Sequence, residues 1–298
     1  MQAIISLLQG GPLIGKDLVP CFRGNTLAAW QTCSVEPAFA TVIIGRRYLR
    51  LDAKVEGYAR LSPSIMREFL NYTIVGLAGR QQSLSREASR LQKDIARISA
   101  MKINLARQTI GRLVSNHSDR GRLLRQTCFI IAGDVVFNMA HAEPRPEGST
   151  GELVRGSDLD IIVITDGLSS DAVAELDALF YREKYNMLVN PAIKEELDYI
   201  IKDLDLVERQ LQFDEFKKMI AAKILDEGVY LYGCKDLFDQ VKQMVANAGI
   251  PAKIADLTRK AIHDRQVAEK VLLNTDAAVD NEQVMALFYT TEEKEEIF

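Results

Sequence analysis

Cysteine and histidine are scarce in this chain of 298 residues, which contains four cysteines and three histidines. The cysteines are too scattered to form a Cys-x-x-Cys pair, and no histidine stands at a zinc-ligand spacing from them. A zinc site is therefore not expected. Scattered cysteines that form no disulfide framework are typical of the reducing cytoplasm. We therefore expect a cytoplasmic protein with free, mostly buried thiols: Cys21, Cys33, Cys128 and Cys234.

The chain also lacks a long apolar run, a basic leader and an excess of positive charge. No stretch approaches the ~20 apolar residues of a transmembrane helix, and the first residues, Met-Gln-Ala-Ile-Ile, include no basic one. The formal net charge is −4, so the chain as a whole has no electrostatic footprint for nucleic acid. With 47% hydrophobic and 26% charged residues, the composition indicates a soluble globular protein without membrane partners, long enough for two domains.

One segment, residues 156–166, has the composition of a functional site. Asp158 and Asp160 are separated by one apolar residue and lead directly into the β-branched run 161–164, which predicts a buried strand. Because residues i and i+2 of a strand share a face, the two carboxylates project together, and a hard divalent cation can supply the counter-charge they need. The alternative is a solvated strand start behind a Gly-Ser turn.

Two strings of the sequence belong together: Phe129-Ile130-Ile131-Ala132-Gly133-Asp134 and Arg155-Gly156-Ser157-Asp158-Leu159-Asp160. An apolar run ending in a glycine motif, followed by Asp-x-Asp on a strand, resembles the nucleotidyltransferase superfamily related to DNA polymerase β. The minimal and antibiotic-modifying members are the most similar. The resemblance covers residues 121–240 and implies an α+β fold, a nucleotidyltransferase-type mixed sheet flanked by helices.

The resemblance also implies the chemistry. Asp158, Asp160 and a third carboxylate on a neighbouring strand, Asp198, would be catalytic and would hold Mg²⁺ or Mn²⁺. Glu196 lies on the same side of its strand by period-2 counting and is the reserve. The reaction transfers a nucleoside monophosphate from a nucleoside triphosphate, ATP first, to a hydroxyl of a protein, an RNA or a small molecule. The residues implied to contact the nucleotide are Gly133, Asp134, Gly156, Ser157 and Arg155.

The sequence departs from the family pattern in two places. Asp134 stands where relatives usually have Ser or Gly, and an acid facing a triphosphate is repulsive unless a cation intervenes. The segment 143–151 reads as a mobile loop between the two motif halves, in which Arg145, like Arg155 beyond it, can supply charge to phosphates or be solvated. The alternative function is a DNA-binding regulator or antitoxin-like protein with an inactive nucleotidyltransferase fold.

Residues 1–80 predict a small module that resembles a winged helix-turn-helix. Three short helices, the third capped at Asn25 or Thr26, precede two strands around a turn within residues 41–51. A further helix is expected over 65–78, with its cap at Ser62. The module contacts DNA phosphates or serves protein interaction, and both alternatives remain open. The candidate phosphate contacts are Arg46, Arg47 and Arg50.

The remaining segments predict helices. An amphipathic linker helix within 81–120 keeps a heptad rhythm from Leu84 to Leu105 that Lys102 interrupts. It either packs along its own protein or pairs residues 83–118 in a homodimer. The nucleotidyltransferase core occupies 121–240, with a helix over 206–226, and a helical region over 241–298 ends in an acidic tail from residue 290 that we expect to be mobile.

Overall fold

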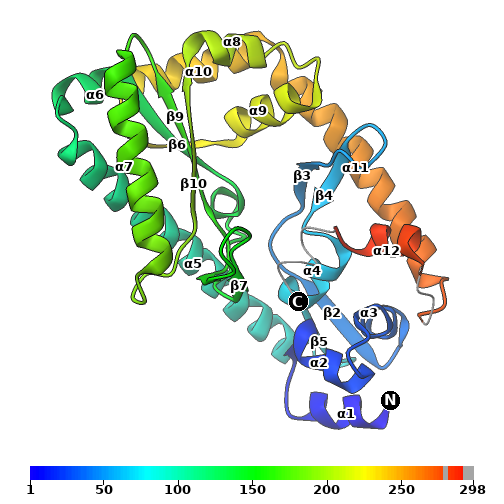
Figure 1. Ribbon diagram of the computed structural model, residues 1–298. Helices are drawn as coiled ribbons and strands as arrows, with labels where there is room; N and C mark the ends of the chain where they lie inside the picture. Colours follow the sequence, from blue (N-terminus) through cyan, green and yellow to red (C-terminus); the bar gives the residue numbers. More distant parts are fainter. Residues whose placement is uncertain (278–280, 291–298) are drawn as a thin grey trace. The chain divides into compact units, whose positions relative to one another are not determined.

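The computed structural model describes residues 1–277 and 281–290, and most of the tail expected to be mobile lies outside them. The fold is α+β, and the chain forms two compact units (Figure 1). One unit comprises Met1–Asp94 with Leu257–Phe298, and the other comprises Ile95–Asp256. The long helix expected after residue 80 contributes to both units, and so does the C-terminal helical region.

A mixed four-stranded sheet forms the centre of the unit Ile95–Asp256. Its strands are β6 (Thr127–Ala132), β9 (Leu159–Thr165), β10 (Leu197–Asp203) and β11 (Val229–Gly233), in the spatial order β10-β9-β6-β11. Strands β9 and β10 run parallel, whereas β6 is antiparallel to both of its neighbours, β9 and β11. The strands predicted from the β-branched run 161–164 and from residues 199–202 are confirmed.

Helices cover both faces of this sheet, because alternate residues of each strand are apolar on opposite sides. Phe129, Ile131 and Ile161 pack against α5 (Gln81–Asn116), α6 (Arg120–Gln126) and α7 (Ser170–Val189). Ile130 and Ile162 pack against α8 (Leu204–Gln210), α9 (Phe216–Glu227) and α10 (Lys235–Asn247). The single helix expected over 206–226 is therefore wrong, since the chain breaks into α8 and α9.

Helix α5 confirms the long amphipathic helix. Part of its apolar stripe is buried, with Leu84, Ala88 and Ile95 at most 7% exposed, whereas Leu91, Ile98 and Leu105 are half-buried. Lys102, which interrupts the heptad rhythm, is also buried, at 3% exposed. Pairing of residues 83–118 in a homodimer stays a prediction.

The other unit contains a three-stranded antiparallel sheet in the order β1-β5-β2. Its elements are α1 (Gln2–Gln9), β1 (Leu13–Ile14), α2 (Gly15–Leu18), the 3₁₀ helix η1 (Val19–Phe22), α3 (Thr26–Val35), β2 (Phe39–Ile43) and β5 (Thr73–Leu77). Asn25 caps α3 by accepting a hydrogen bond from the Ala28 amide at 2.9 Å, as predicted. Helices α11 (Ile250–Leu273) and α12 (Glu282–Phe288) confirm the helical C-terminal region.

Two expectations for this unit are wrong. The strands expected within 41–51 do not pair with each other, because β2 pairs with β5 while β3 (Tyr48–Leu51) pairs with β4 (Ala59–Ser62). The helix expected over 65–78 is α4 (Ile65–Tyr72), which ends where β5 begins. Its cap is Ser64, which accepts from the Arg67 amide at 3.1 Å, and not Ser62.

A short hairpin replaces the loop expected over 143–151. It consists of β7 (Pro144–Pro146) and β8 (Leu153–Arg155), which pair antiparallel, and it follows the 3₁₀ helix η2 (Asp134–Phe137). Within the described residues, none of the helices combines the length with the apolar character that crossing a lipid bilayer requires.

Candidate metal centre

Three carboxylates converge at the start of the two parallel strands. Asp158 directly precedes β9, Glu196 directly precedes β10, and Asp198 is the second residue of β10. One carboxylate oxygen of each lies within 4.8 Å of the others. The pairing of β9 with β10 brings them together, because a parallel register aligns residue 160 with residue 198. Glu196, the reserve candidate of the sequence, is thus a full member of this carboxylate cluster.

Asp160 lies beside the carboxylate cluster and faces Gly133. It is opposite Asp198 in the strand register. A Cβ at Gly133 would stand 2.2 Å from Asp160 Oδ2, and Gly133 has a φ of +77°. The glycine therefore makes room for the carboxylate. Burial, followed by the charges of Asp198 and Asp134, raises the pKa of Asp160 to about 6.

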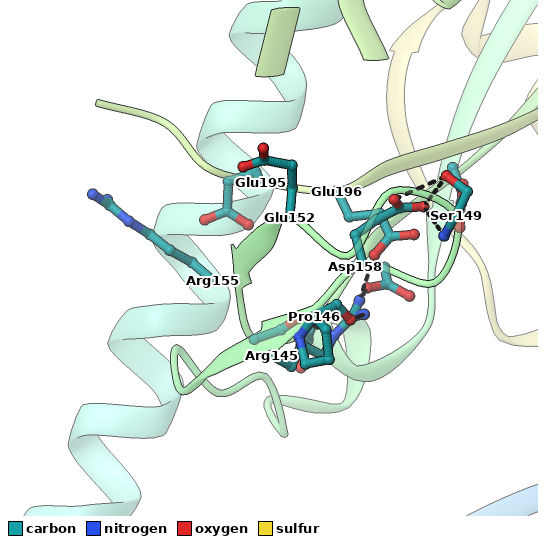
Figure 2. Close-up of polar contacts among 12 residues, drawn as sticks. Arg145, Pro146, Ser149, Glu152, Arg155, Asp158, Glu195 and Glu196 are labelled. Carbon is teal, nitrogen blue, oxygen red and sulfur yellow. Dashed lines mark hydrogen bonds and ion pairs between the residues drawn. The ribbon is translucent and has the colours of Figure 1, made fainter. Parts of the chain in front are cut away.

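Arg145 of the hairpin reaches into the carboxylate cluster. Its guanidinium forms an ion pair with Asp158, and its Nη2 donates to Glu196 Oε2 at 2.8 Å. The Nε donates to the Gly156 carbonyl at 2.8 Å, and the residue is only 7% exposed. Figure 2 shows Arg145 directed at Asp158 and Glu196, whereas the Arg155 side chain points away from them. Arg155 is exposed, so Arg145 is the one of the two arginines that contacts the carboxylate cluster. The expected contact of Arg155 with a nucleotide stays a prediction.

Lys184 of α7 forms an ion pair with Asp198. Burial works against the charge of this lysine, but the hydrogen bond and the negative charge of Asp198 outweigh it and raise the pKa of Lys184. The carboxylate cluster therefore contains two cations, Arg145 and Lys184. Neither was assigned to it from the sequence alone.

The motif residues Gly156 and Ser157 serve the protein's own backbone. The Ser157 hydroxyl donates to Asp134 Oδ2 at 3.1 Å and accepts from the His141 amide at 3.2 Å. A Cβ at Gly156, which has a φ of +63°, would lie 2.0 Å from the His141 carbonyl oxygen. Both residues thus fasten residue 141 against the start of β9. Their expected contact with a nucleotide stays a prediction.

A buried ion pair supports the segments that carry the carboxylates. Lys102 of α5 pairs with Glu195, and its Nζ also donates to the Arg155 carbonyl at 2.6 Å. Burial lowers the pKa of Lys102 and raises that of Glu195, and each partner only partly offsets the effect. The lysine braces the residues before Asp158 and Glu196 together. In the sequence its only sign was a charge at an apolar heptad position.

Helix α9 adds a second ion pair near Asp160. Lys223 Nζ lies 2.5 Å from Glu227 Oε2, and the charge of Lys223 partly counteracts the rise in the pKa of Asp160. Burial raises the pKa of Glu227, to which Asp134 also contributes. Helix α9 thus places a cation and an acid within electrostatic range of Asp160.

One arginine of the N-terminal module, Arg47, forms ion pairs within its own unit. Arg47 Nε lies 2.6 Å from Glu68 Oε2, and its Nη2 lies 3.0 Å from Glu269 Oε1. The hydrogen bond to Glu68 is the largest cause of the raised pKa of Arg47. Arg47 therefore ties α4 to α11 within its unit, while Arg46 is exposed and Arg50 half-buried. Contact with DNA stays a prediction.

Comparisons of the chain with protein-family models, with curated proteins and with solved structures found no match. The chemistry of the site is therefore inferred from its own residues. Carboxylate oxygens are hard ligands that suit Mg²⁺ or Mn²⁺ and not a soft metal. The described residues that offer such ligand atoms together are Asp158, Glu196 and Asp198, with Asp160 next to them.

Proposed function

We propose that the unit Ile95–Asp256 is a metal-dependent nucleotidyltransferase. It would transfer a nucleoside monophosphate from a nucleoside triphosphate, ATP first, to an acceptor hydroxyl of a protein, an RNA or a small molecule. The observation that carries the proposal is the convergence of Asp158, Glu196 and Asp198 at the start of two parallel strands, with Asp160 in register with Asp198. Phosphoryl transfer requires such a cluster, because its charge development is stabilised by metal ions held between carboxylates and phosphates.

The residues fit a divalent cation in their donor type and in their charge. All donors are carboxylate oxygens, and the raised pKa of Asp160 shows that burial and its acidic neighbours work against its charge. Additional positive charge would favour the ionised form of this carboxylate. A bound Mg²⁺ or Mn²⁺ would neutralise charge on the triphosphate and make the acceptor hydroxyl more acidic.

The protein's own side chains would handle the proton and the acceptor. Asp198 would accept the proton of the acceptor hydroxyl, and Lys184 beside it would hold the carboxylate in place. The acceptor oxygen then forms a bond to the α-phosphorus, while the bond from that phosphorus to the bridging oxygen breaks. The bonding pair leaves with pyrophosphate. The expected contact of Gly133 with phosphates stays a prediction, since the space that its missing side chain leaves is taken by the Asp160 carboxylate.

Transfer of label tests the proposal. The protein is incubated with each of four α-³²P-labelled triphosphates and Mg²⁺ or Mn²⁺, and label is sought on the protein, on RNA and on small molecules. Asp158→Asn and Asp198→Asn should each lower the rate of transfer by at least about 100-fold. Substitution of a residue that only hydrogen-bonds to a metal ligand already lowers activity by up to about 100-fold. Asp166→Asn is the matched control, because Asp166 is exposed and follows the opposite end of β9. Label that survives both site variants contradicts the proposal.

One observation favours the alternative of a regulator with an inactive site. Asp134 stays within electrostatic range of Asp160, where an acid repels phosphates. The regulator should shift DNA in a salt-dependent way that Asp158→Asn leaves intact and Arg46→Ala/Arg50→Ala abolishes. Arg47 is left out of this pair, since its ion pairs with Glu68 and Glu269 support the fold.

A further inference from the structure

The guanidinium of Arg145 lies where a cation bound by the carboxylate cluster would lie. It contacts Asp158 and Glu196, two of the three carboxylates whose oxygens lie within 4.8 Å of one another. The exposed fraction of Arg145 is 7%. A buried arginine of this kind neutralises the carboxylates and also competes with any other cation for the same oxygens.

The hairpin that carries Arg145 is built as a small unit of its own. Strands β7 and β8 have three residues each and pair with one another in a two-stranded sheet. Its turn is closed internally by Glu147, which accepts from the amides and hydroxyls of Ser149 and Thr150 at 2.7 to 3.1 Å. Leu153 is 59% exposed, whereas its neighbour Val154 is buried at 1% exposed. The Arg155 end of the hairpin is also held by hydrogen bonds with Lys102 and Lys194. A shift of the hairpin would therefore pivot on β8 and move β7, which carries Arg145, together with the turn.

Charge balance favours an exchange over a permanent ion pair. The three carboxylates of the cluster face two cations, Arg145 and Lys184, and Asp160 adds a further acid. Replacing the single charge of Arg145 by a divalent cation brings the total closer to neutrality. The ion pair of Arg145 with Asp158 and its hydrogen bond to Glu196 are lost on exchange. Its Nε donates to the backbone carbonyl of Gly156, which is not part of the cluster.

We propose that Arg145 is a resident counter-cation of the carboxylate cluster, which a divalent cation displaces, so that metal binding moves the β7–β8 hairpin. This inference rests on the metal site of the proposed function. In the proposed reaction the displaced guanidinium becomes available to phosphate oxygens, which arginine binds in a bidentate manner. Metal loading and exposure of a phosphate-binding group would then be one event.

The affinity of the full chain for Mn²⁺, measured by electron paramagnetic resonance, tests the exchange. Arg145→Gln should bind Mn²⁺ at least about tenfold more tightly than the wild type, since a unit charge in direct contact with the ligands is removed. Arg145→Lys keeps the positive charge but loses the planar guanidinium with its paired N–H donors. Its affinity for Mn²⁺ should therefore lie between those of the wild type and Arg145→Gln. Arg155→Gln is the matched control: it removes the same charge from the same hairpin, at an exposed side chain that points away.

Hydrogen exchange of the wild-type protein provides a measurement that needs no variant. Addition of Mn²⁺ should speed amide exchange in peptides that cover residues 143–156, and it should leave β6 and β9 protected. Unchanged or weaker Mn²⁺ binding by Arg145→Gln overturns the exchange, and so does a hairpin whose exchange slows or stays constant. If the wild type binds Mn²⁺ and transfers nucleotide while these tests fail, only this inference is lost. Absence of Mn²⁺ binding in both the wild type and Arg145→Gln removes the metal site itself.

Discussion

Substitution of Gly133 by alanine should impair the candidate site through a displaced carboxylate and the fold through backbone strain. The new Cβ would lie 2.2 Å from Asp160 Oδ2, whereas ordinary contact begins at 3.4 Å, so the carboxylate oxygen must retreat by 3.4 − 2.2 = 1.2 Å. A displacement of about 1 Å in a catalytic group lowers rates by about 100-fold. The stability effect is smaller, because the atom that must move is the end of a side chain. The positive φ itself costs about 1–3 kcal/mol.

Gly151→Ala separates backbone strain from displacement of the carboxylate. Gly151 has a φ of +71°, close to the +77° of Gly133, but a Cβ there meets nothing within 4 Å. Both variants should lose stability in urea unfolding, because both positions have a positive φ. Only Gly133→Ala should also lose nucleotide transfer by about 100-fold, and it should bind Mn²⁺ more weakly. Equal transfer rates in the two variants would refute the assignment of Asp160 to the site.

Three further predictions concern buried groups. Burial lowers the pKa of Lys202 to about 8, so the folded state disfavours its charge, and stability should rise with pH between about 8 and the ordinary value of 10.5. Lys202→Met should abolish that rise and stabilise the protein at pH 7 by about 2 kcal/mol. This is the desolvation penalty of the charged lysine minus the contribution of one lost hydrogen bond. Urea unfolding at pH 7 and at pH 9.5 measures the stability at pH 7 and its rise with pH. Glu195→Gln should destabilise the protein by about 3–5 kcal/mol because it leaves Lys102 buried and charged, and the double variant with Lys102→Met should recover most of the loss in the same assay. Burial raises the pKa of the Cys128 thiol to about 12, so in the folded protein iodoacetamide at pH 8 should modify the exposed Cys21 and spare Cys128, as peptide mass mapping would reveal.

Local patterns in the sequence were sufficient for most elements. The β-branched run after Asp160 defines a strand because its side chains suit a doubly covered sheet, and β9 is that strand. The cap at Asn25 and the periodicity of α5 follow equally from neighbouring residues. The cap of α4 was misplaced by two residues, because Ser62 and Ser64 flank the same proline and both have a capping side chain.

Pairings between distant segments could not be obtained in this way. Strand β2 pairs with β5, thirty residues further on, and not with the next strand. Periodicity identifies which side of a strand is apolar, but it does not identify the strand's neighbour. The pairing of the two strands expected within 41–51 was therefore wrong, although β2 and β3 lie there.

The order of residues was enough to put Asp158 and Asp160 at the start of a buried strand and to suggest a third acid near residue 198. That Glu196 joins Asp158 and Asp198, and that Arg145 and Lys184 supply their counter-charges, follows from the packing of the folded chain. These groups are far apart along the chain. Arg145 and Glu196 are 51 residues apart, and Lys102 and Glu195 are 93 apart. Such contacts form when strands and helices pack, and no local pattern records them.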